Sequence, residues 1–311
     1  RVPARVAKVL APSEQQLLSR ADFETLYAGN QAVGMPPVEI AWRNLRLAAR
    51  DGPGQIRLST LAEKIAVNHL PDELNDPPVA PLVISTIHRS KGREFERVVM
   101  PDDTYFFESS GRFEQAEETR VLFVALSRAR DEIWQKDIPP VGTGYLEKDG
   151  ERWTQRAHGQ GGVLLGIEVT TGDVDRMFPP GGHRLEGEDP SQIQHYLSHE
   201  VHVGDEVVLE FITGTTKVDP CAFYRICHNG QTIGVTSGPF GEGLARMLGA
   251  EWKHSMRWPM RIQDVYVESV ATMGGTSAST ERAGLGVSGL WLTTHVSGLG
   301  RLKDLRAGSD G

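Results

Sequence analysis

The sequence predicts an α/β segment with a parallel sheet, followed by a small β-rich barrel or sandwich domain. Short β-branched or apolar runs at residues 82–87, 97–100 and 132–136 are typical of buried strands. An amphipathic stretch at 114–130 separates the last two runs, and strand, crossover helix and strand is the pattern of a helix-covered parallel sheet. After residue 163, short strand-like runs alternate with turns rich in Gly, Asn and Asp, which is typical of small all-β domains.

Composition limits the classes of protein that fit. A chain of 311 residues predicts two or three domains, and 39% hydrophobic residues is an ordinary globular mix. The net charge of −8 argues against a general polyanion-binding surface but permits a local basic groove. Cys221 and Cys227 cannot build a disulfide framework, so we expect a reducing, cytoplasmic compartment. No apolar run approaches the ~20 residues that cross a bilayer, so no membrane partner is expected.

Residues 1–78 are predicted to be a helical segment that belongs to an incomplete domain. Ser13 is expected to cap a helix over 14–28, and a second helix is expected over 38–52, where apolar residues recur at spacings of three and four. Ser59 or Thr60 is expected to cap a third helix. A proline-rich stretch then interrupts regular structure before the α/β segment at 79–140.

Residues 141–162 are predicted to be a linker, and 163–311 a β-rich accessory domain. The expected strands are residues 163–169, 206–212, 222–228, 232–238, 265–272 and 290–296, with one helix at 241–249. Asn229-Gly230 is a strong hairpin signal. The glycines at 284, 286 and 289 form G-x-G-x-x-G, but a strand-like run follows them, so a glycine-rich turn is favoured over a dinucleotide site. His195, His199 and His202 are interpreted as polar loop residues, and no metal site is predicted.

Two segments carry the functional signal. Residues 85–95 read STIHRSKGREF and residues 117–130 read EETRVLFVALSRAR. In residue types, order and spacing they resemble motifs V and VI of UvrD/Rep/PcrA-like superfamily 1 DNA helicases. The resemblance covers residues 80–137 and implies that 79–140 is the core of a second RecA-like domain of the P-loop NTPase type. It also implies ATP and Mg²⁺ as cofactors and single-stranded DNA as a partner.

The resemblance assigns nucleotide-facing roles to three residues. Arg128 matches the arginine finger, whose planar guanidinium stabilises charge on the transferring phosphoryl group. Glu94 matches the residue that accepts hydrogen bonds from the ribose hydroxyls, and Gly92 would permit close backbone approach. The alternatives are a solvated arginine at a helix end and a surface glutamate at a helix start.

Thr86, His88 and Lys91 match positions that contact the single-strand backbone, where hydroxyl, imidazole and ammonium groups all donate to phosphate. For His88 the alternative is a hydrogen-bonded core histidine. Because one short segment would face both ligands, nucleotide chemistry and DNA contacts would be coupled. No N-[YF]-R-S-like motif IV precedes these segments, so a second phosphate-sensing arginine is not assigned.

The sequence contains no G-x-x-x-x-G-K-[ST] loop and no apolar strand that ends in an Asp-Glu pair. The resemblance places both, with the Mg²⁺ ligands, in an N-terminal RecA-like domain, which would be the missing partner of this chain. The first residue is Arg1 and the first methionine is Met35. We therefore expect the C-terminal part of an ATP-dependent 3′–5′ DNA helicase, inactive alone. The alternative is a non-catalytic nucleic-acid or partner-binding protein that retains this domain.

Residues 203–248 distantly resemble HIRAN domains, which are small barrels that bind single-stranded DNA ends. The matching features are a G-D-x-V-x-L strand, Asp219, an N-G-Q-x-I-G hairpin and a trailing helix. A docking domain for a protein partner is an equal alternative.

Overall fold

The chain divides into two compact units. In this computed structural model, the first unit comprises Arg1–Pro77 with Thr143–Gly311, and the second comprises Pro78–Gly142. The structure describes residues 2–30, 35–71, 74, 87, 90, 92–102, 112–137, 144–150, 152–157, 163–181, 184–215, 221–255 and 258–303. Within these residues, no helix combines the length and apolar character needed to cross a membrane.

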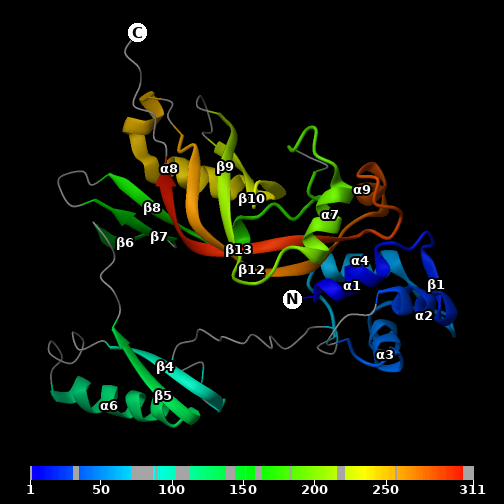
Figure 1. Ribbon diagram of the computed structural model, residues 1–311, viewed down its shortest axis with the longest axis horizontal. Coiled ribbons are helices and arrows are strands. Elements are labelled where there is room, and N and C mark those ends of the chain that lie inside the picture. Colours follow the sequence, from blue (N-terminus) through cyan, green and yellow to red (C-terminus); the bar gives the residue numbers. More distant parts are fainter. Residues whose placement is uncertain are drawn as a thin grey trace. The chain divides into compact units, whose positions relative to one another are not determined.

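The second unit is a parallel strand–helix–strand unit. Strand β4 (Phe95–Asp102) leads through α6 (Arg112–Leu126) to β5 (Ala129–Asp137), and the two strands pair in parallel. Helix α6 runs alongside this pair (Figure 1). These elements confirm the α/β character and the parallel pairing predicted for this segment. The strand expected at 82–87 lies outside the described residues except for Ile87.

The first unit is built on one eight-stranded antiparallel sheet, in the order β11-β10-β9-β12-β13-β8-β7-β6. Its strands are β6 (Tyr145–Asp149), β7 (Arg152–Arg156), β8 (Leu164–Val169), β9 (Glu206–Thr215), β10 (Cys221–His228), β11 (Gln231–Val235), β12 (Arg261–Gly274) and β13 (Leu290–Lys303). The β-rich prediction is confirmed for all six expected strands. Instead of a closed barrel or a two-sheet sandwich, the described strands form one sheet with two edges, because β6 and β11 do not pair.

The expected linker at 141–162 contains the hairpin of β6 and β7, which joins the sheet through β8. Gly150 lies in the turn of this hairpin, and charged residues lie on its two strands. Gly150, at φ +65°, starts the tight turn, and the alternating strand residues bury Thr154. The hairpin predicted at Asn229-Gly230 is confirmed: both residues have positive φ, and His228 pairs with Gln231. The glycine-rich 284–289 stretch is a turn before β13, as predicted.

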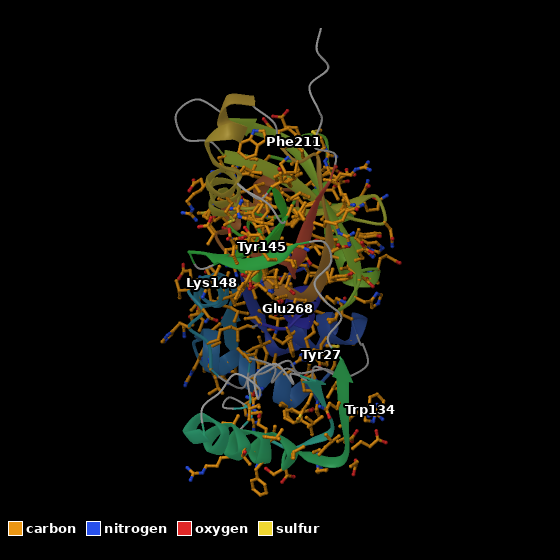
Figure 2. All side chains as sticks on the ribbon, turned by 90° about the vertical axis from the view of Figure 1, so that its left-hand side faces the viewer. Tyr27, Trp134, Tyr145, Lys148, Phe211 and Glu268 are labelled. Carbon is orange, nitrogen blue, oxygen red and sulfur yellow. The ribbon has the colours of Figure 1, made fainter. Side chains whose placement is uncertain are left out.

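Four further elements cover the sheet or close its ends. They are the 3₁₀ turn η2 (Thr171–Asp173), α7 (Pro190–His199), α8 (Gly238–Ser255) and α9 (Ser277–Arg282). Helix α8 contains the predicted 241–249 helix. The main core is formed by inward residues of the strands with α7 and α8, among them Leu209, Tyr224, Phe240 and Ile262, which are fully buried. Phe211 packs against this core, with its ring centroid 5.7 Å from that of Tyr224 (Figure 2).

The N-terminal segment forms a small helical layer with its own core. It comprises α1 (Ala4–Leu10), β1 (Leu17–Ser19), α2 (Arg20–Gly29), α3 (Val38–Ala49), β2 (Arg50–Asp51), β3 (Gln55–Arg57) and α4 (Leu58–Ala66). The three short strands pair in the order β1-β3-β2. Phe23, Tyr27 and Trp42 stack around its centre at centroid distances of 5.3 and 5.4 Å. The helix predicted over 38–52 is confirmed as α3 but ends at Ala49, and Arg50 and Asp51 form β2 instead.

Two helix starts differ from the prediction. Ser13 caps no helix; its hydroxyl bonds within a turn to Gln15, and the chain pairs as β1 before Ser19 caps α2. Ser19 Oγ accepts from the Asp22 amide, and the Asp22 carboxylate accepts from the Ser19 amide, so the capping box starts six residues later. Helix α4 begins at Leu58, before both expected caps.

The helical layer packs on the large sheet, a contact that the sequence did not predict. Pro3 bridges to Ala271, the Ala7 amide donates to Thr272 Oγ1 at 2.9 Å, and the Thr272 amide donates to the Val2 carbonyl at 3.0 Å. Gly274 lies so close to α4 that an added Cβ would sit 2.1 Å from the Ala62 carbonyl oxygen. Residues 1–77 therefore share a folded unit with 143–311.

Candidate functional site

The two motif segments meet at the amino-terminal edge of the parallel pair. Phe95 begins β4 and lies opposite Ala129, which begins β5. The Phe95 amide donates to the Arg128 carbonyl at 2.8 Å. In a parallel pair the starts of both strands lie at one edge, so residues 92–94 and 127–130, about 35 positions apart in the chain, become neighbours.

Gly92 lies in the turn that leads into β4, with φ of +83°. Apart from its chain neighbours, no atom of the described residues lies within 4 Å of the position that its Cβ would occupy. The glycine is therefore explained by its left-handed backbone, since L side chains rarely adopt this conformation. Before it, Ser90 is buried, and both its amide and its hydroxyl donate to the Ile87 carbonyl, at 3.2 and 2.8 Å. The described part of the segment is thus a sequence of tight turns.

Arg128 follows the end of α6, and its guanidinium binds nearby oxygens. Its Nε donates to the Val124 carbonyl at 3.0 Å, its Nη1 to the Arg93 carbonyl at 3.3 Å and its Nη2 to Ser127 Oγ at 2.9 Å. The bond to Arg93 links the two motif segments directly. Arginine at a helix end satisfies carbonyls that lack intrahelical partners and offsets the negative end of the dipole. Three of the five guanidinium N–H groups are used.

Glu94 and Arg130 form a second link between the segments. Arg130 Nε lies 3.9 Å from Glu94 Oε2, and the side chains are 60% and 66% exposed. Such an open pair contributes at most about 1 kcal/mol to stability. An exposed carboxylate retains its capacity to accept hydrogen bonds from a ligand, so this geometry is compatible with the expected contact to sugar hydroxyls.

Gly92, Glu94 and Arg128 lie together at the edge described above, whereas Thr86, His88 and Lys91 lie outside the described residues. The carbonyl of Arg93 and the side chain of Arg130 were not predicted as parts of this edge. Arg93 and Arg130 reach this edge because of the register between β4 and β5, and this register cannot be read from the sequence.

Farther along the same strands, Arg97 organises an exposed cluster. Its Nε donates to Glu132 Oε2 at 2.7 Å, and its guanidinium carbon lies 4.0 Å from the ring centroid of Trp134 on β5 (Figure 2). Arg97 and Glu132 are opposite each other in the register. The contacts are those of a cross-strand salt bridge with a cation–π interaction, which stabilise the pair of strands.

The three closely spaced histidines, His195, His199 and His202, do not form a metal site among the described residues. His195 and His199 stack on α7 with centroids 4.4 Å apart, and His202 hydrogen-bonds through its amide to Asp205. Across the described residues, no group of three or more His, Cys, Asp or Glu side chains has the arrangement of a metal site. All three side chains are exposed, but His195 and His199 lie on α7 and not in a loop as expected, and His202 follows the helix.

One comparison with known proteins finds a match, and it lies in the second unit. Residues 81–134 match the family model of the UvrD-like helicase C-terminal domain. The match spans β4, α6 and most of β5, with the motif segments that meet at their edge. No curated protein and no solved structure matches the chain. The chain therefore contains a UvrD-like helicase C-terminal region.

Proposed function

We propose that this chain is the C-terminal part of an ATP-dependent DNA helicase or translocase with 3′–5′ polarity. The observation that carries the proposal is the meeting of motif V and motif VI residues at one edge of β4 and β5, inside the segment that matches the helicase family. A second RecA-like domain would offer this edge to nucleotide bound by the first.

Arg128 would act as the arginine finger. Its guanidinium is already oriented by the Val124 and Arg93 carbonyls, and relative to the described residues two of its N–H groups remain for a phosphate. ATP supplies the phosphoryl group, and Mg²⁺ would be held by the first RecA-like domain. An arginine placed against the developing phosphoryl charge accelerates such transfers by roughly 10³ to 10⁵. Glu94 would orient the ribose, and Gly92 would shape the turn beside it.

Thr86, His88 and Lys91 would contact the single-stranded DNA backbone. They belong to the same segment as Glu94, so movement of this segment during hydrolysis would reach the DNA contacts. The alternative function is binding of nucleic acid or a partner protein without catalysis. Both functions place these residues at a ligand, but only the helicase requires Arg128 for turnover.

The test is Arg128→Ala in the helicase assembled with its first RecA-like domain. We expect kcat for DNA-stimulated ATP hydrolysis to fall by about 10² or more with little change in ATP affinity, because a finger acts on transition-state charge. Arg128→Lys should not restore the rate, since an ammonium lacks the planar fork. Arg97→Ala, which removes an exposed arginine of β4 in the same unit, is the matched control and should retain activity. An unchanged kcat in Arg128→Ala would remove this residue from the site.

A further inference from the structure

The Arg128 guanidinium is held along one edge by two oxygens at the end of α6. Its Nε donates to the Val124 carbonyl at 3.0 Å, and its Nη2 donates to Ser127 Oγ at 2.9 Å. Nε and Nη2 lie on the same edge of a guanidinium, because Nη1 is the terminal nitrogen on the side of Cδ. Two bonds to one edge fix the plane of the group, whereas a single bond leaves it free to rotate.

The way in which α6 ends makes these oxygens available. The Ser127 amide donates to the Phe123 carbonyl at 3.0 Å, as in an α-helix, but the Arg128 amide donates to the Ala125 carbonyl at 3.1 Å, only three residues back. The Arg128 amide therefore passes over the Val124 carbonyl, which is one of the carbonyls that a helix end leaves to other donors. Two side chains bind it instead, through Arg128 Nε and through Ser127 Oγ at 2.9 Å.

The Ser127 hydroxyl has a fixed direction. A hydroxyl carries one proton and two lone pairs, and this proton is donated to the Val124 carbonyl. The oxygen therefore faces Arg128 Nη2 as an acceptor. Hydrogen bonds from a charged donor are roughly twice as strong as neutral ones. Ser127 is exposed, so this residue contributes to no core, and its hydroxyl bonds within the described residues all bear on the position of the guanidinium.

The third described bond of Arg128 runs from Nη1 to the Arg93 carbonyl at 3.3 Å. Each terminal nitrogen of a guanidinium carries two N–H groups, so relative to the described residues Nη1 and Nη2 each keep one. Donors on both terminal nitrogens can bind two oxygens of one phosphate group. The contacts at the end of α6 thus hold the guanidinium while it retains the donors that a phosphoryl group needs.

We propose that Ser127 is a positioning residue for the arginine finger. Its hydroxyl holds Nη2, so that the guanidinium of Arg128 is oriented before the phosphoryl group arrives. This inference rests on the proposed function, because it requires Arg128 to act on phosphate. An arginine that is already oriented loses less side-chain freedom in the transition state. The contribution of Ser127 should therefore appear in kcat and not in ATP affinity.

The contact itself is tested in the whole 311-residue chain without nucleotide. NMR of the arginine side chains measures how fast Nη2 rotates about its bond to Cζ, and loss of a signal in Arg128→Lys identifies this residue. Ser127→Ala should speed the rotation by about threefold or more, because Nη2 loses its acceptor. Ser127→Thr should leave the rate unchanged, since a threonine hydroxyl makes the same bonds at a helix end. Equal rates in the wild-type chain and in Ser127→Ala would overturn the proposal.

The role in turnover is tested in the helicase assembled with its first RecA-like domain. Ser127→Ala should lower kcat for ATP hydrolysis by about fivefold, with unchanged affinities for ATP and single-stranded DNA. Ser127→Thr should retain the rate. In an Arg128→Ala background, Ser127→Ala should cause no further loss, because a residue that acts only through the finger then has nothing to position. A merely structural role would lower the rate and the melting temperature in both backgrounds.

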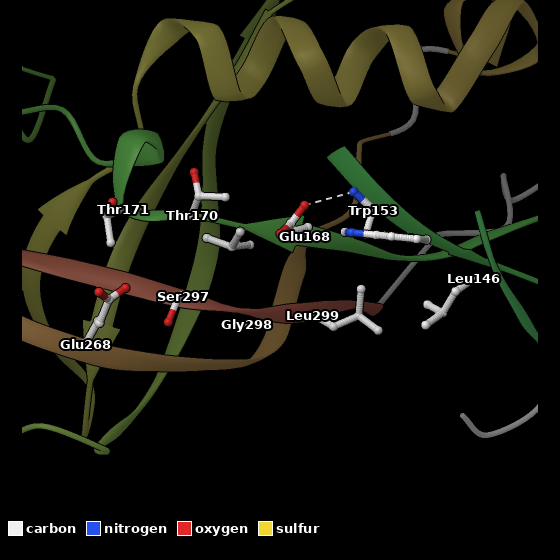
Figure 3. Close-up of a pocket in the computed structure, with 10 residues that line it drawn as sticks. Leu146, Trp153, Glu168, Thr170, Thr171, Glu268, Ser297, Gly298 and Leu299 are labelled. Atoms are coloured by element: carbon white, nitrogen blue, oxygen red, sulfur yellow. Dashed lines mark hydrogen bonds between the residues drawn. The ribbon is translucent and has the colours of Figure 1, made fainter. Parts of the chain in front are cut away.

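Ser297→Ala is the control in the first unit. Ser297 of β13 lies in a groove of about 640 Å³, together with Glu168 and Thr170 (Figure 3). This volume lies within the range of ligand sites, so an unchanged rate in Ser297→Ala also shows that the loss is specific to the motif edge. If Arg128→Ala keeps its rate, the proposed function fails and this inference with it. If Arg128→Ala loses its rate whereas Ser127→Ala does not, or if the two losses add, only the role of Ser127 is wrong.

Discussion

Arg152 and Asp173 show how a single buried ion pair joins three parts of the first unit. Arg152 on β7 donates from Nη1 to Asp173 Oδ2 at 2.6 Å and from Nη2 to Oδ1 at 2.7 Å. Its Nη1 also donates to the Glu168 carbonyl on β8. The hydrogen bonds to Asp173 raise the pKa of the Arg152 guanidinium, so this group stays charged. Asp173 in turn accepts from the Thr170 amide and closes η2.

Arg152→Met should therefore lower the free energy of unfolding by about 3 kcal/mol, because it leaves the Asp173 charge buried without its main partner. The two side chains are 19% and 4% exposed. Arg301→Met is the matched control: the pair of Arg301 with Asp264 is 56% and 34% exposed, so its loss should cost about 1 kcal/mol or less. Urea unfolding of both variants measures the difference. Equal losses would show that the buried pair behaves like a surface pair.

At the scale of elements, the turn at 229–230 determines the register of β10 and β11. Asn229 and Gly230 have φ of +49° and +79°, the conformation of a two-residue hairpin turn that matches strand twist. Gly230→Ala should cost about 1 kcal/mol of unfolding free energy, since a Cβ disfavours this conformation. Gly243→Ala is the control. This residue lies within α8 with no atom within 4 Å of the added Cβ, so the change should stabilise by up to about 1 kcal/mol. Urea unfolding measures both variants. If the two substitutions change the free energy of unfolding in the same direction, the different roles given to these two glycines are wrong.

Elements whose signals are local were predictable from the sequence. Helix α3 follows from apolar residues spaced three and four apart, and β10 and β11 follow from strand patterns around Asn-Gly. The start of α4 was not predictable, because its cap comes from a distant residue. Gln16 accepts from the Leu58 amide through its carbonyl and from the Ser59 amide through Oε1. Such a cap exists only after β1 and β3 have paired.

The candidate site was predictable in part, because some of its signals are local in the sequence and others depend on contacts between distant residues. The two motif segments are visible in the sequence, and Arg128 and Glu94 were named from them. That the Arg128 guanidinium reaches the Arg93 carbonyl, and that Arg130 faces Glu94, depends on the parallel register of β4 and β5.

At the scale of the whole molecule, the folded unit formed by residues 1–77 and 143–311 is discontinuous in the chain. The segment that matches the helicase family is inserted between its two parts. The helical layer supplies the neighbours of Thr272 and Gly274, and Leu290 of β13 belongs to the core of that layer. Without residues 1–77, this surface of β12 and β13 would be exposed to water, and exposed apolar surface of this kind favours aggregation.

We therefore expect residues 1–77 and 143–311, expressed as two separate chains, to associate and to purify together through a tag on the shorter one. Gly274→Ala in the longer chain should weaken this association, because its Cβ would lie 2.1 Å from the Ala62 carbonyl oxygen and 2.9 Å from Ala62 Cα, and backbone cannot yield as a flexible side chain can. Gly243→Ala, the same substitution where space is open, should leave association unchanged. The amount of the longer chain retained on the tag measures the effect. Failure of the unmodified pair to associate, with the longer chain folded and monomeric alone, would show that the helical layer is not an integral part of this unit.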